Sequence, residues 1–330
     1  MYKYLRVAAL ALLLTGHSSF LFAKTPWGED YFPNVPLITH EGKVVHFFDD
    51  LIKDKVVVIN FIYTHCSDSC PLETAQLTRV QKIMGDRLGK DVFFYSISID
   101  PENDTAAVLK EYRDRFKARW TFLTGKKSDI ILLRKKLGLY IEEIQDGSNN
   151  HNVSLIIGNQ ATGRWMKRSP FENSHVLADQ IGNWLTGWKT ATVTNDYKDA
   201  PKLRNISRGE QIFRTRCASC HSVTGHELAE ALGPDLLNIS NRREQQWLFN
   251  WLKAPDQMLE NKDPIAIALY KKYNNLVMPN MRLNKQEVQA LLKYIDDETL
   301  RLQANSEQTV AKTSASEDMT GVSIELLSKE

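Results

Sequence analysis

The chain has 330 residues, of which 42% are hydrophobic and 25% are charged. This length and composition are typical of a globular protein of two ordinary domains and exclude a wholly disordered chain. Lys and Arg total 42 against 40 Asp and Glu, and the resulting net charge of +2 lacks the basic excess of nucleic-acid-binding proteins. We therefore predict no nucleic-acid partner.

The N-terminus resembles an export signal. Lys3 and Arg6 precede an apolar core from Val7 to Leu14, and a weaker apolar stretch ends at Ala23. So short an apolar core favours a signal peptide, residues 1–23, over an uncleaved membrane anchor. We expect an exported protein of the bacterial periplasm, which would contact a membrane only through a partner or an uncleaved signal.

Residues 24–188 are predicted to form an α/β domain in which a mixed sheet is flanked by helices. Val56 to Tyr63 is an almost unbroken apolar run, rich in β-branched residues, and predicts a central strand that is buried on both faces. The other elements expected are a hairpin over 35–47, helices over 71–88, 105–116, 128–137 and 174–188, strands over 92–99 and 120–123, and a hairpin over 151–167.

The central strand leads to Cys66 and Cys70, and Pro71 follows at a position suited to the first turn of a helix. The N-terminus of such a helix would stabilise a thiolate on Cys70. Three residues separate the two cysteines, where ordinary thioredoxins have two. The pattern predicts a thioredoxin-like redox dithiol or a soft-metal site. A structural disulfide is the weaker alternative, because it would close only a small loop.

Two thiolates can hold a soft ion such as Cu(I), and a neutral imidazole is the usual third ligand. His65 directly neighbours Cys66, and adjacent residues rarely converge on one ion. His151 precedes a predicted strand and follows a loop expected beside the cysteine loop. From the residues alone, His151 is either a ligand or an ordinary surface residue.

Residues 206–301 are predicted to form a second, all-helical domain. Ser207 and Glu210 form a capping box for its first helix, and Asn284 and Glu287 form one for its last. Polar residues 189–205 before this domain predict a linker. Residues 302–330, rich in Ser, Thr, Ala and Glu, predict a disordered tail.

The strongest motif is Cys217-Ala-Ser-Cys220-His221, the c-type haem attachment pattern. Both thiols would form thioethers to the porphyrin, and His221 would bind the iron. A sixth ligand is expected later in the domain. Met278, followed by proline in the loop before the last helix, is the first candidate, and Met281 and Met258 are the alternatives.

Residues 34–188 resemble the Sco/SenC family of thioredoxin-like copper-handling proteins. The resemblance is carried by Cys66 to Pro71, by Ser98 to Thr105 and by His151 ahead of its strand. It implies that Cys66, Cys70 and His151 bind one copper ion. It also implies a role in assembly of the binuclear copper centre of cytochrome c oxidase, by copper delivery, by reduction of target cysteines, or both.

The chain departs from the Sco/SenC pattern at two positions. Asn150 stands where the family usually has aspartate, and Asn103 stands where arginine is common. The first change removes a carboxylate close to the implied ligand His151. Asp100 is interpreted as part of a turn, and Asp104 or Thr105 as the cap of the helix over 105–116. The resemblance implies that their loop flanks the metal site.

Residues 206–295 resemble class I cytochrome c. The carrying residues are the haem motif, the loop from Gly233 to Leu236, the pair Gly209 and Phe213 opposite Tyr294, and the dipeptide Met278-Pro279. The resemblance implies one covalent haem c, a loop packed against the histidine side of the ring, and Met278 as the sixth ligand.

These observations lead to one main hypothesis: a copper-binding electron-transfer protein or copper chaperone, rather than a turnover enzyme. The haem would exchange single electrons with the copper or accept them from the dithiol, because methionine ligation raises a haem potential and thioredoxin-like dithiols are strong reductants. The expected partner is the copper-bearing subunit of cytochrome c oxidase or another periplasmic copper or thiol protein.

Two alternatives stay open at this point. The first is a metal-free thiol–disulfide oxidoreductase in which Cys66 and Cys70 react and the haem is the electron partner. The second is a plain electron carrier whose first domain docks to an oxidase.

Overall fold

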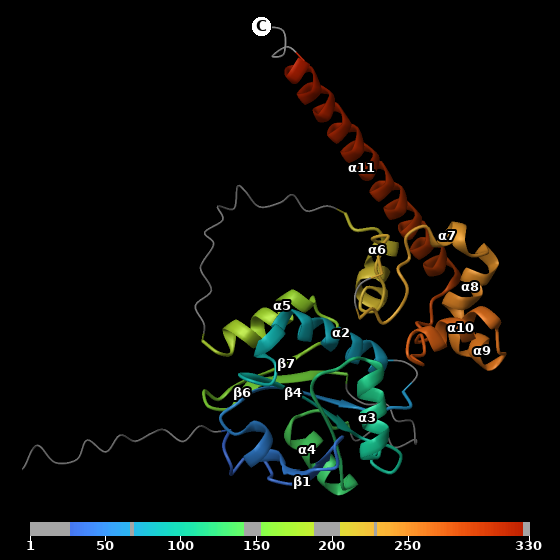
Figure 1. Ribbon diagram of the computed structural model, residues 1–330. Coiled ribbons are helices and arrows are strands. Elements are labelled where there is room, and N and C mark those ends of the chain that lie inside the picture. Colours follow the sequence, from blue (N-terminus) through green and yellow to red (C-terminus); the bar gives the residue numbers. More distant parts are fainter. Residues whose placement is uncertain (1–26, 67–68, 142–152, 188–204, 228–229, 326–330) are drawn as a thin grey trace, which may run out of the picture.

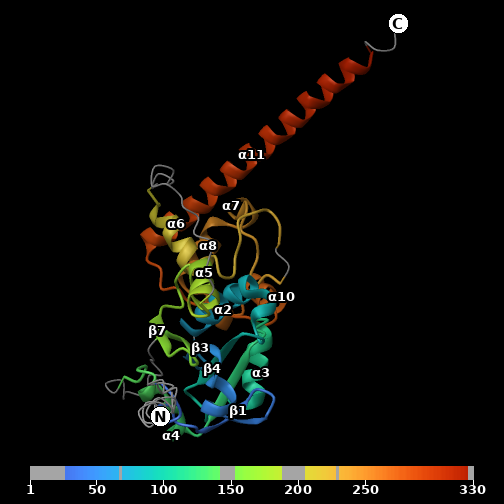
Figure 2. The same ribbon diagram turned by 90° about the vertical axis from the view of Figure 1, so that its left-hand side faces the viewer.

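The computed structural model describes residues 27–66, 69–141, 153–187, 205–227 and 230–325, and of residues 307–325 the backbone alone. A sheet domain is followed by a helical domain, and the last helix leads away from both in two perpendicular views (Figures 1 and 2). The predicted signal peptide, residues 1–23, lies outside the described residues, and the predicted linker lies almost wholly outside them.

The first domain is built on a seven-stranded sheet of order β2-β1-β5-β4-β3-β6-β7. β3 lies parallel to β4 and antiparallel to β6, so it occupies an interior position. A strand that leads into a two-cysteine loop, between a parallel and an antiparallel neighbour, is the arrangement of a thioredoxin-like sheet. The strands are β1 (Pro36–Thr39), β2 (Val44–His46), β3 (Val56–Ile62), β4 (Val92–Ser98), β5 (Thr121–Gly125), β6 (Leu155–Asn159) and β7 (Arg164–Arg168).

Helices cover both faces of this sheet (Figure 1). They are α2 (Ser69–Met84), α3 (Ala106–Arg115), α4 (Lys127–Lys136) and α5 (Ser174–Asp179), with helical turns at Phe47–Ile52, Gly85–Arg87 and Gln180–Trp184. Alternate residues of β3 point to opposite faces of the sheet and pack into different hydrophobic clusters. Val56 and Val58 pack with α2, whereas Val57 and Ile59 pack with the core beneath α4. Every residue of β3 is buried, as predicted for a strand covered on both faces.

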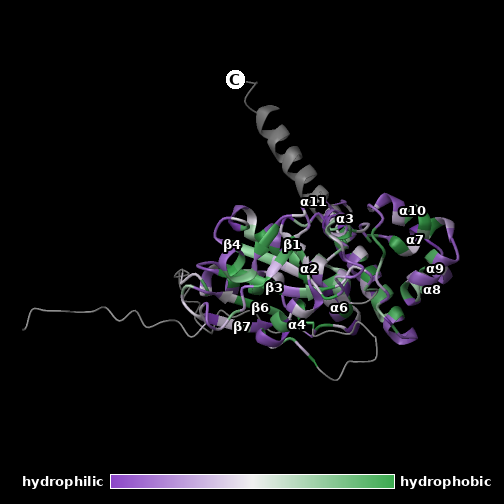
Figure 3. Cartoon of the chain, turned by 90° about the horizontal axis from the view of Figure 1, so that it is seen from below, coloured by the Kyte–Doolittle hydropathy of each residue, from purple (hydrophilic) through white to green (hydrophobic). Residues whose placement is uncertain are grey.

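Hydrophobic residues accordingly concentrate in the strands and on the helix faces that meet them (Figure 3).

The predicted elements are present with shifted ends. α2 begins two residues before the predicted Pro71 and ends at Met84, because Gly85 adopts a left-handed conformation with φ of 55°. The strand of the second hairpin begins at Leu155, and residues 151–152 lie outside the described part of the chain.

The second domain is helical, as predicted. Its helices are α6 (Arg208–Ile212), a continuing turn (Phe213–Cys217), α7 (Ile239–Arg242), α8 (Gln245–Lys253), α9 (Pro255–Glu260), α10 (Pro264–Lys272) and α11 (Lys285–Glu325). α6 crosses α11 at Gly209, where a Cβ would lie 1.9 Å from the Ala290 carbonyl oxygen. The rings of Phe213 and Tyr294 lie 5.5 Å apart at the same crossing. Only glycine permits so close an approach of the two helices.

Capping fixes where α11 begins. The Asn284 N–H donates to Glu287 Oε2 at 3.1 Å, and the Glu287 N–H donates to Asn284 Oδ1 at 3.0 Å. This is the reciprocal capping box expected from the sequence. Ser207 likewise accepts a hydrogen bond from the Glu210 N–H at 3.1 Å.

The predicted disordered tail is wrong for residues 302–325, which continue α11 to Glu325. Extending an existing helix adds a hydrogen bond per residue without a new nucleus, and the Ala, Glu, Gln and Lys residues of this segment favour it. Among the described helices, none combines the length and the apolar character that crossing a membrane requires.

Candidate metal centres

The first candidate centre is the loop between β3 and α2. Cys66 is 8% exposed and Cys70, in the first turn of α2, is fully buried. The Cys70 N–H donates to Cys66 Sγ at 3.4 Å. The helical turn therefore holds the two sulfurs together beneath the surface. All four cysteines of the chain are described, and none is in a disulfide.

The prediction that the helix N-terminus stabilises a Cys70 thiolate is wrong for this arrangement. The hydrogen bond with Cys66 and burial together raise the pKa of the Cys70 thiol well above its usual range. Cys70 lies inside the helix rather than ahead of it, and burial favours the neutral thiol over the thiolate. Cys70 is therefore expected to keep its proton until a soft metal binds its sulfur or the pair is oxidised to a disulfide.

The chain before Cys66 is fastened by Asp104, which is fully buried. Its carboxylate accepts from the Thr64 N–H at 3.1 Å, from Thr64 Oγ1 at 2.5 Å and from Ser98 Oγ at 2.6 Å. Asp104 thus ties the end of β4 to the cysteine loop. Of the two residues expected to cap α3, Thr105 is the cap, since its side chain accepts from the Val108 N–H. The turn formed by Asp100 is present, because its carbonyl accepts from the Asn103 and Asp104 N–H groups.

A second carboxyl lies one turn into α2. Glu73 is fully buried, and neither of its carboxylate oxygens has a hydrogen-bond partner. Burial raises the pKa of Glu73 to about 8, an increase that the Asn60 amide opposes and the Cys66 sulfur reinforces. A neutral carboxylic acid therefore lies close to the cysteine pair at pH 7.

The third copper ligand stays a prediction, because His151 and Asn150 lie outside the described residues. Within the described part of the chain, no three His, Cys, Asp or Glu side chains form a metal-binding cluster. His65 is exposed, and its Nδ1 lies 3.3 Å from Thr64 Oγ1. The structure thus brings Cys66 and Cys70 together and leaves the completion of their site to be tested.

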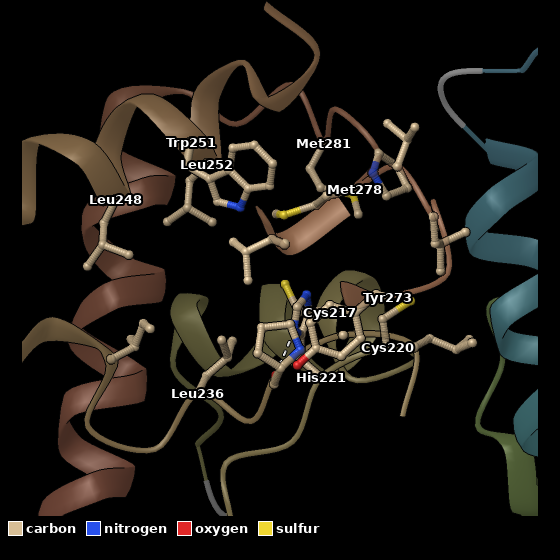
Figure 4. A pocket seen from close by; sticks show the side chains of 18 of the residues that line it. Cys217, Cys220, His221, Leu236, Leu248, Trp251, Leu252, Tyr273, Met278 and Met281 are labelled. Atoms are coloured by element: carbon tan, nitrogen blue, oxygen red, sulfur yellow. Dashed lines mark hydrogen bonds between the residues drawn. The ribbon is translucent and has the colours of Figure 1, made fainter. Parts of the chain in front are cut away.

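The second candidate centre is an apolar crevice in the helical domain (Figure 4). Cys217, Cys220 and His221 line one side of it, on the loop that follows α6. His221 Nδ1 lies 2.9 Å from the Pro234 carbonyl oxygen, which fixes the ring and leaves Nε2 for another partner. Gly233 packs so closely on this ring that a Cβ would lie 2.6 Å from His221 Cε1. The loop from Gly233 to Leu236 thus occupies the place predicted for it.

Met278 and Met281 lie on the side of the crevice opposite His221 (Figure 4). Both come from the loop between α10 and α11. Met258, on α9, is not among the residues that line the crevice. The geometry therefore keeps Met278 and Met281 as candidates for the sixth iron ligand and removes Met258.

The remaining lining is mainly apolar but includes Arg216, Arg242 and Arg243, and burial shifts the pKa values of the thiols and the imidazole in the crevice. Burial raises the pKa of Cys217 to about 12 and that of Cys220 to about 11. Burial lowers the pKa of His221, which keeps its imidazole neutral, the form that binds iron. The apolar walls include Leu236, Leu248, Trp251, Leu252, Leu291 and Ile295.

The donors and walls of the crevice fit a haem c. Two thiols at the required spacing lie beside an oriented imidazole, and the apolar walls suit a flat porphyrin ring. The methionine sulfurs lie across the crevice from His221. A thioredoxin-like domain that buries a cysteine pair is thus followed by a helical domain with this crevice, an architecture suited to redox chemistry.

Two family models match the chain. The SCO1/SenC model matches residues 29–185, and the cytochrome c model matches residues 206–298. The chain therefore contains a SCO1/SenC domain at residues 29–185 and a cytochrome c domain at residues 206–298. A cytochrome c domain implies a haem.

Individual relatives each match a part of the chain. An SCO2-like protein of Rickettsia felis is 27% identical over 143 residues, 42% of this chain and 68% of that protein. The crystal structure of Arabidopsis thaliana ScoI with copper bound is 27% identical, covers 44% of this chain and 92% of that one, and has a TM-score of 0.38. The cytochrome c domain of the pp3183 protein from Pseudomonas putida is 54% identical, covers 29% of this chain and 91% of that one, and has a TM-score of 0.27.

Sequence reasoning missed two residues of the first centre. Asp104 was assigned to a cap, although its position after β4 and the polar Thr64 after β3 place both at the carboxyl ends of neighbouring parallel strands. Glu73 was not singled out at all. Its signal was spacing, because a carboxyl three residues after Cys70 falls on the same buried helix face.

Proposed function

We propose that this chain is an exported protein that binds copper through Cys66, Cys70 and His151, carries one covalent haem c, and acts in maturation of the copper centre of cytochrome c oxidase. The partner would be the copper-bearing oxidase subunit or another periplasmic copper or thiol protein. Membership of the SCO1/SenC family supports this role. So does the donor chemistry, since paired thiols select soft Cu(I).

The observation that carries the proposal is the buried cysteine pair. Cys66 and Cys70 lie one helical turn apart, and the Cys70 N–H donates to the Cys66 sulfur, so both thiols are placed before any metal arrives. Asp104 holds the preceding residues in place. Such preorganisation lowers the entropic cost of binding an ion between the two sulfurs.

In the second domain, Cys217 and Cys220 would hold the haem by thioether bonds, and His221 with Met278 or Met281 would bind its iron. The haem supplies a one-electron redox couple. The chain's own residues orient the histidine through Pro234, exclude water with apolar walls and place a methionine loop across from the imidazole.

A Cu(I) titration of the full-length protein, in competition with a coloured Cu(I) chelator, tests the proposal. The parent is expected to take up one Cu(I). Cys66→Ser and His151→Ala are each expected to weaken binding by about 10–100-fold or more, the range that even outer-shell changes produce. Cys217→Ser is the matched cysteine control and should leave Cu(I) affinity unchanged.

Binding by His151→Ala as tight as by the parent would contradict the three-ligand site and favour the thiol–disulfide oxidoreductase. Loss of oxidase copper loading in cells that carry only Cys66→Ser would support the maturation role. Normal loading in those cells would favour the plain electron carrier.

A further inference from the structure

The two domains meet at the cysteine pair of the first domain. Leu232 of the second domain is buried in the same apolar cluster as Cys66 and Cys70. Leu276, also of the second domain, is partly buried and packs against this cluster. Pro71, in the first turn of α2, lines the crevice of the second domain, beside which that helix lies (Figure 4). The second domain therefore covers the end of α2 that carries the cysteines.

The contact between the domains has an apolar centre and a polar rim. At the rim, the Asn274 side chain donates to the Asp114 carbonyl oxygen at 3.4 Å. Charged side chains of both domains line a hollow beside this bond, namely Arg115 and Lys117 of the first domain and Glu227, Glu230 and Lys272 of the second. An apolar centre ringed by polar groups is typical of interfaces between domains that move relative to one another.

Each domain also keeps a core of its own. Apart from Leu232, the buried members of the cluster around the cysteines belong to the first domain, and the second domain has a separate cluster that includes Leu291. Side chains of both domains line a further hollow at the boundary, among them Phe171 of the first and Met281 of the second. Because each core lies within its own domain, separation of the domains would unfold neither of them.

We propose that the helical domain is a cap over Cys66 and Cys70, and that it moves away before another protein reaches this pair. The inference rests on the proposed function in one respect, that the pair exchanges copper with a partner. Such a partner must bring its own ligands to the sulfurs. With the domains in contact, Cys70 is fully buried and Cys66 nearly so, and Leu232 and Leu276 occupy one side of the pair.

A cap of this kind sets how often the pair is accessible without supplying a ligand. Variants that weaken the contact between the domains should therefore expose the two thiols more often. Leu276→Ser weakens the apolar centre and leaves both cysteines in place. Leu300→Ser is the matched control, because Leu300 is 65% exposed on α11 and belongs neither to the cluster nor to the described lining of the crevice.

A second pair of variants lies outside the described lining of the crevice. Asn274→Gly removes the hydrogen bond to Asp114, whereas Asn275→Gly makes the same change at the next residue. Both asparagines have a left-handed backbone with φ of 56°, which glycine adopts without strain. Comparison of the two therefore isolates the contact between the domains.

The test is the rate at which iodoacetamide alkylates Cys66 and Cys70 in the full-length, copper-free protein with its dithiol reduced, read by peptide mass spectrometry. When opening and closing are fast, this rate follows the fraction of molecules in which the pair is exposed. We expect alkylation about tenfold faster in Leu276→Ser and about two- to threefold faster in Asn274→Gly than in the parent. Leu300→Ser and Asn275→Gly should match the parent.

Equal rates in the parent, Leu276→Ser and Asn274→Gly would overturn the inference, because the first domain alone would then bury the pair. An equal rise in Leu300→Ser would overturn it too, since the effect would not depend on the contact. Should Leu276→Ser alter the haem absorbance, Asn274→Gly against Asn275→Gly decides alone. These rates are measured without copper, so the Cu(I) titration of the parent decides the proposed function separately.

Discussion

Cys66 and Cys70 lie at the end of a buried strand beside two buried carboxyl groups, whereas Cys217 and Cys220 line an apolar crevice beside a histidine held by a backbone carbonyl. In each pair the two cysteines are close in sequence, but the surroundings of the two pairs suit different chemistry. The residues ahead of the first pair are held by the hydrogen bond from Thr64 to Asp104, and within the pair the Cys70 N–H donates to the Cys66 sulfur. The second is fixed by packing around a slot that suits a flat ring.

The contrast teaches that spacing alone does not determine what a cysteine pair does. In the first loop, the proposed third ligand, His151, belongs to a distant segment of the sequence. In the second, the histidine directly follows the second cysteine and its orienting partner Pro234 lies 13 residues away. Variants that change the residues around one cysteine pair should therefore leave metal or haem binding at the other pair unchanged.

Gly209→Ala should have the largest effect and should act on the haem domain alone. The added Cβ would lie 1.9 Å from the Ala290 carbonyl oxygen, so α6 and α11 must separate. We expect a loss of about 3 kcal/mol in the stability of this domain, at the upper end of overpacking costs. Urea unfolding followed by haem absorbance, which reports on the second domain, measures it.

Gln211→Ala, at an exposed position of α6, is the control and should change the unfolding midpoint little. The copper affinity of Gly209→Ala should equal that of the parent. A haem domain as stable as the parent's would show that α6 and α11 do not cross as closely as the structure places them.

Asp104→Asn should loosen the first loop and leave the haem domain unchanged. The amide presents an N–H₂ group where Thr64 and Ser98 both donate, so at least one buried hydrogen bond is lost. We expect about 1–3 kcal/mol less stability in the first domain and about tenfold weaker Cu(I) binding. Circular dichroism in urea and the chelator competition measure these two quantities.

Asp100→Asn provides the comparison, because Asp100 lies in the same loop and makes its side-chain contact with Asn103 at the surface. Equal copper affinities in Asp104→Asn and Asp100→Asn would contradict the anchoring role of Asp104.

Glu73→Gln should change the pH dependence of stability in the first domain. Burial raises the pKa of Glu73 to about 8 from an ordinary value of 4.5. Between these values the folded state holds one more proton than the unfolded state, so the free energy of unfolding falls as pH rises. The slope reaches at most about 1.4 kcal/mol per pH unit, and the neutral glutamine should abolish it.

Urea midpoints at pH 5, 6, 7 and 8 measure this difference between the parent and Glu73→Gln. Glu260→Gln, an exposed position of α9, should keep the parent's slope. Parallel curves for the parent and Glu73→Gln would show that the buried carboxyl has an ordinary pKa.

Much of this architecture follows from the sequence. The β-branched run from Val56 predicted a strand buried on both faces, and the order of strands and helices predicted a mixed sheet. The capping box at Asn284 fixed the start of α11, and the haem motif predicted which residues meet in the crevice. These features depend on local spacing and periodicity, which a single sequence carries.

Other features depend on contacts between distant segments, and no local pattern shows them. Asp104 reaches Thr64 across 40 residues, and its sequence context equally suits a helix cap. The pKa of the Cys70 thiol is raised by its hydrogen bond with Cys66 and by burial that only the packed domain provides. Pro71 of the first domain lines the crevice of the second because the two domains pack together, which neither domain's motifs encode.

We propose that one chain carries two centres held by different residues, copper at the first cysteine pair and haem at the second. Elemental analysis of the full-length protein, purified after growth with copper, tests it most directly. The account predicts one iron and one copper per chain in the parent. Cys66→Ser with Cys70→Ser should remove the copper and keep the iron, and Cys217→Ser with Cys220→Ser should remove the covalent haem iron and keep the copper. Copper retained without Cys66 and Cys70 would contradict the account.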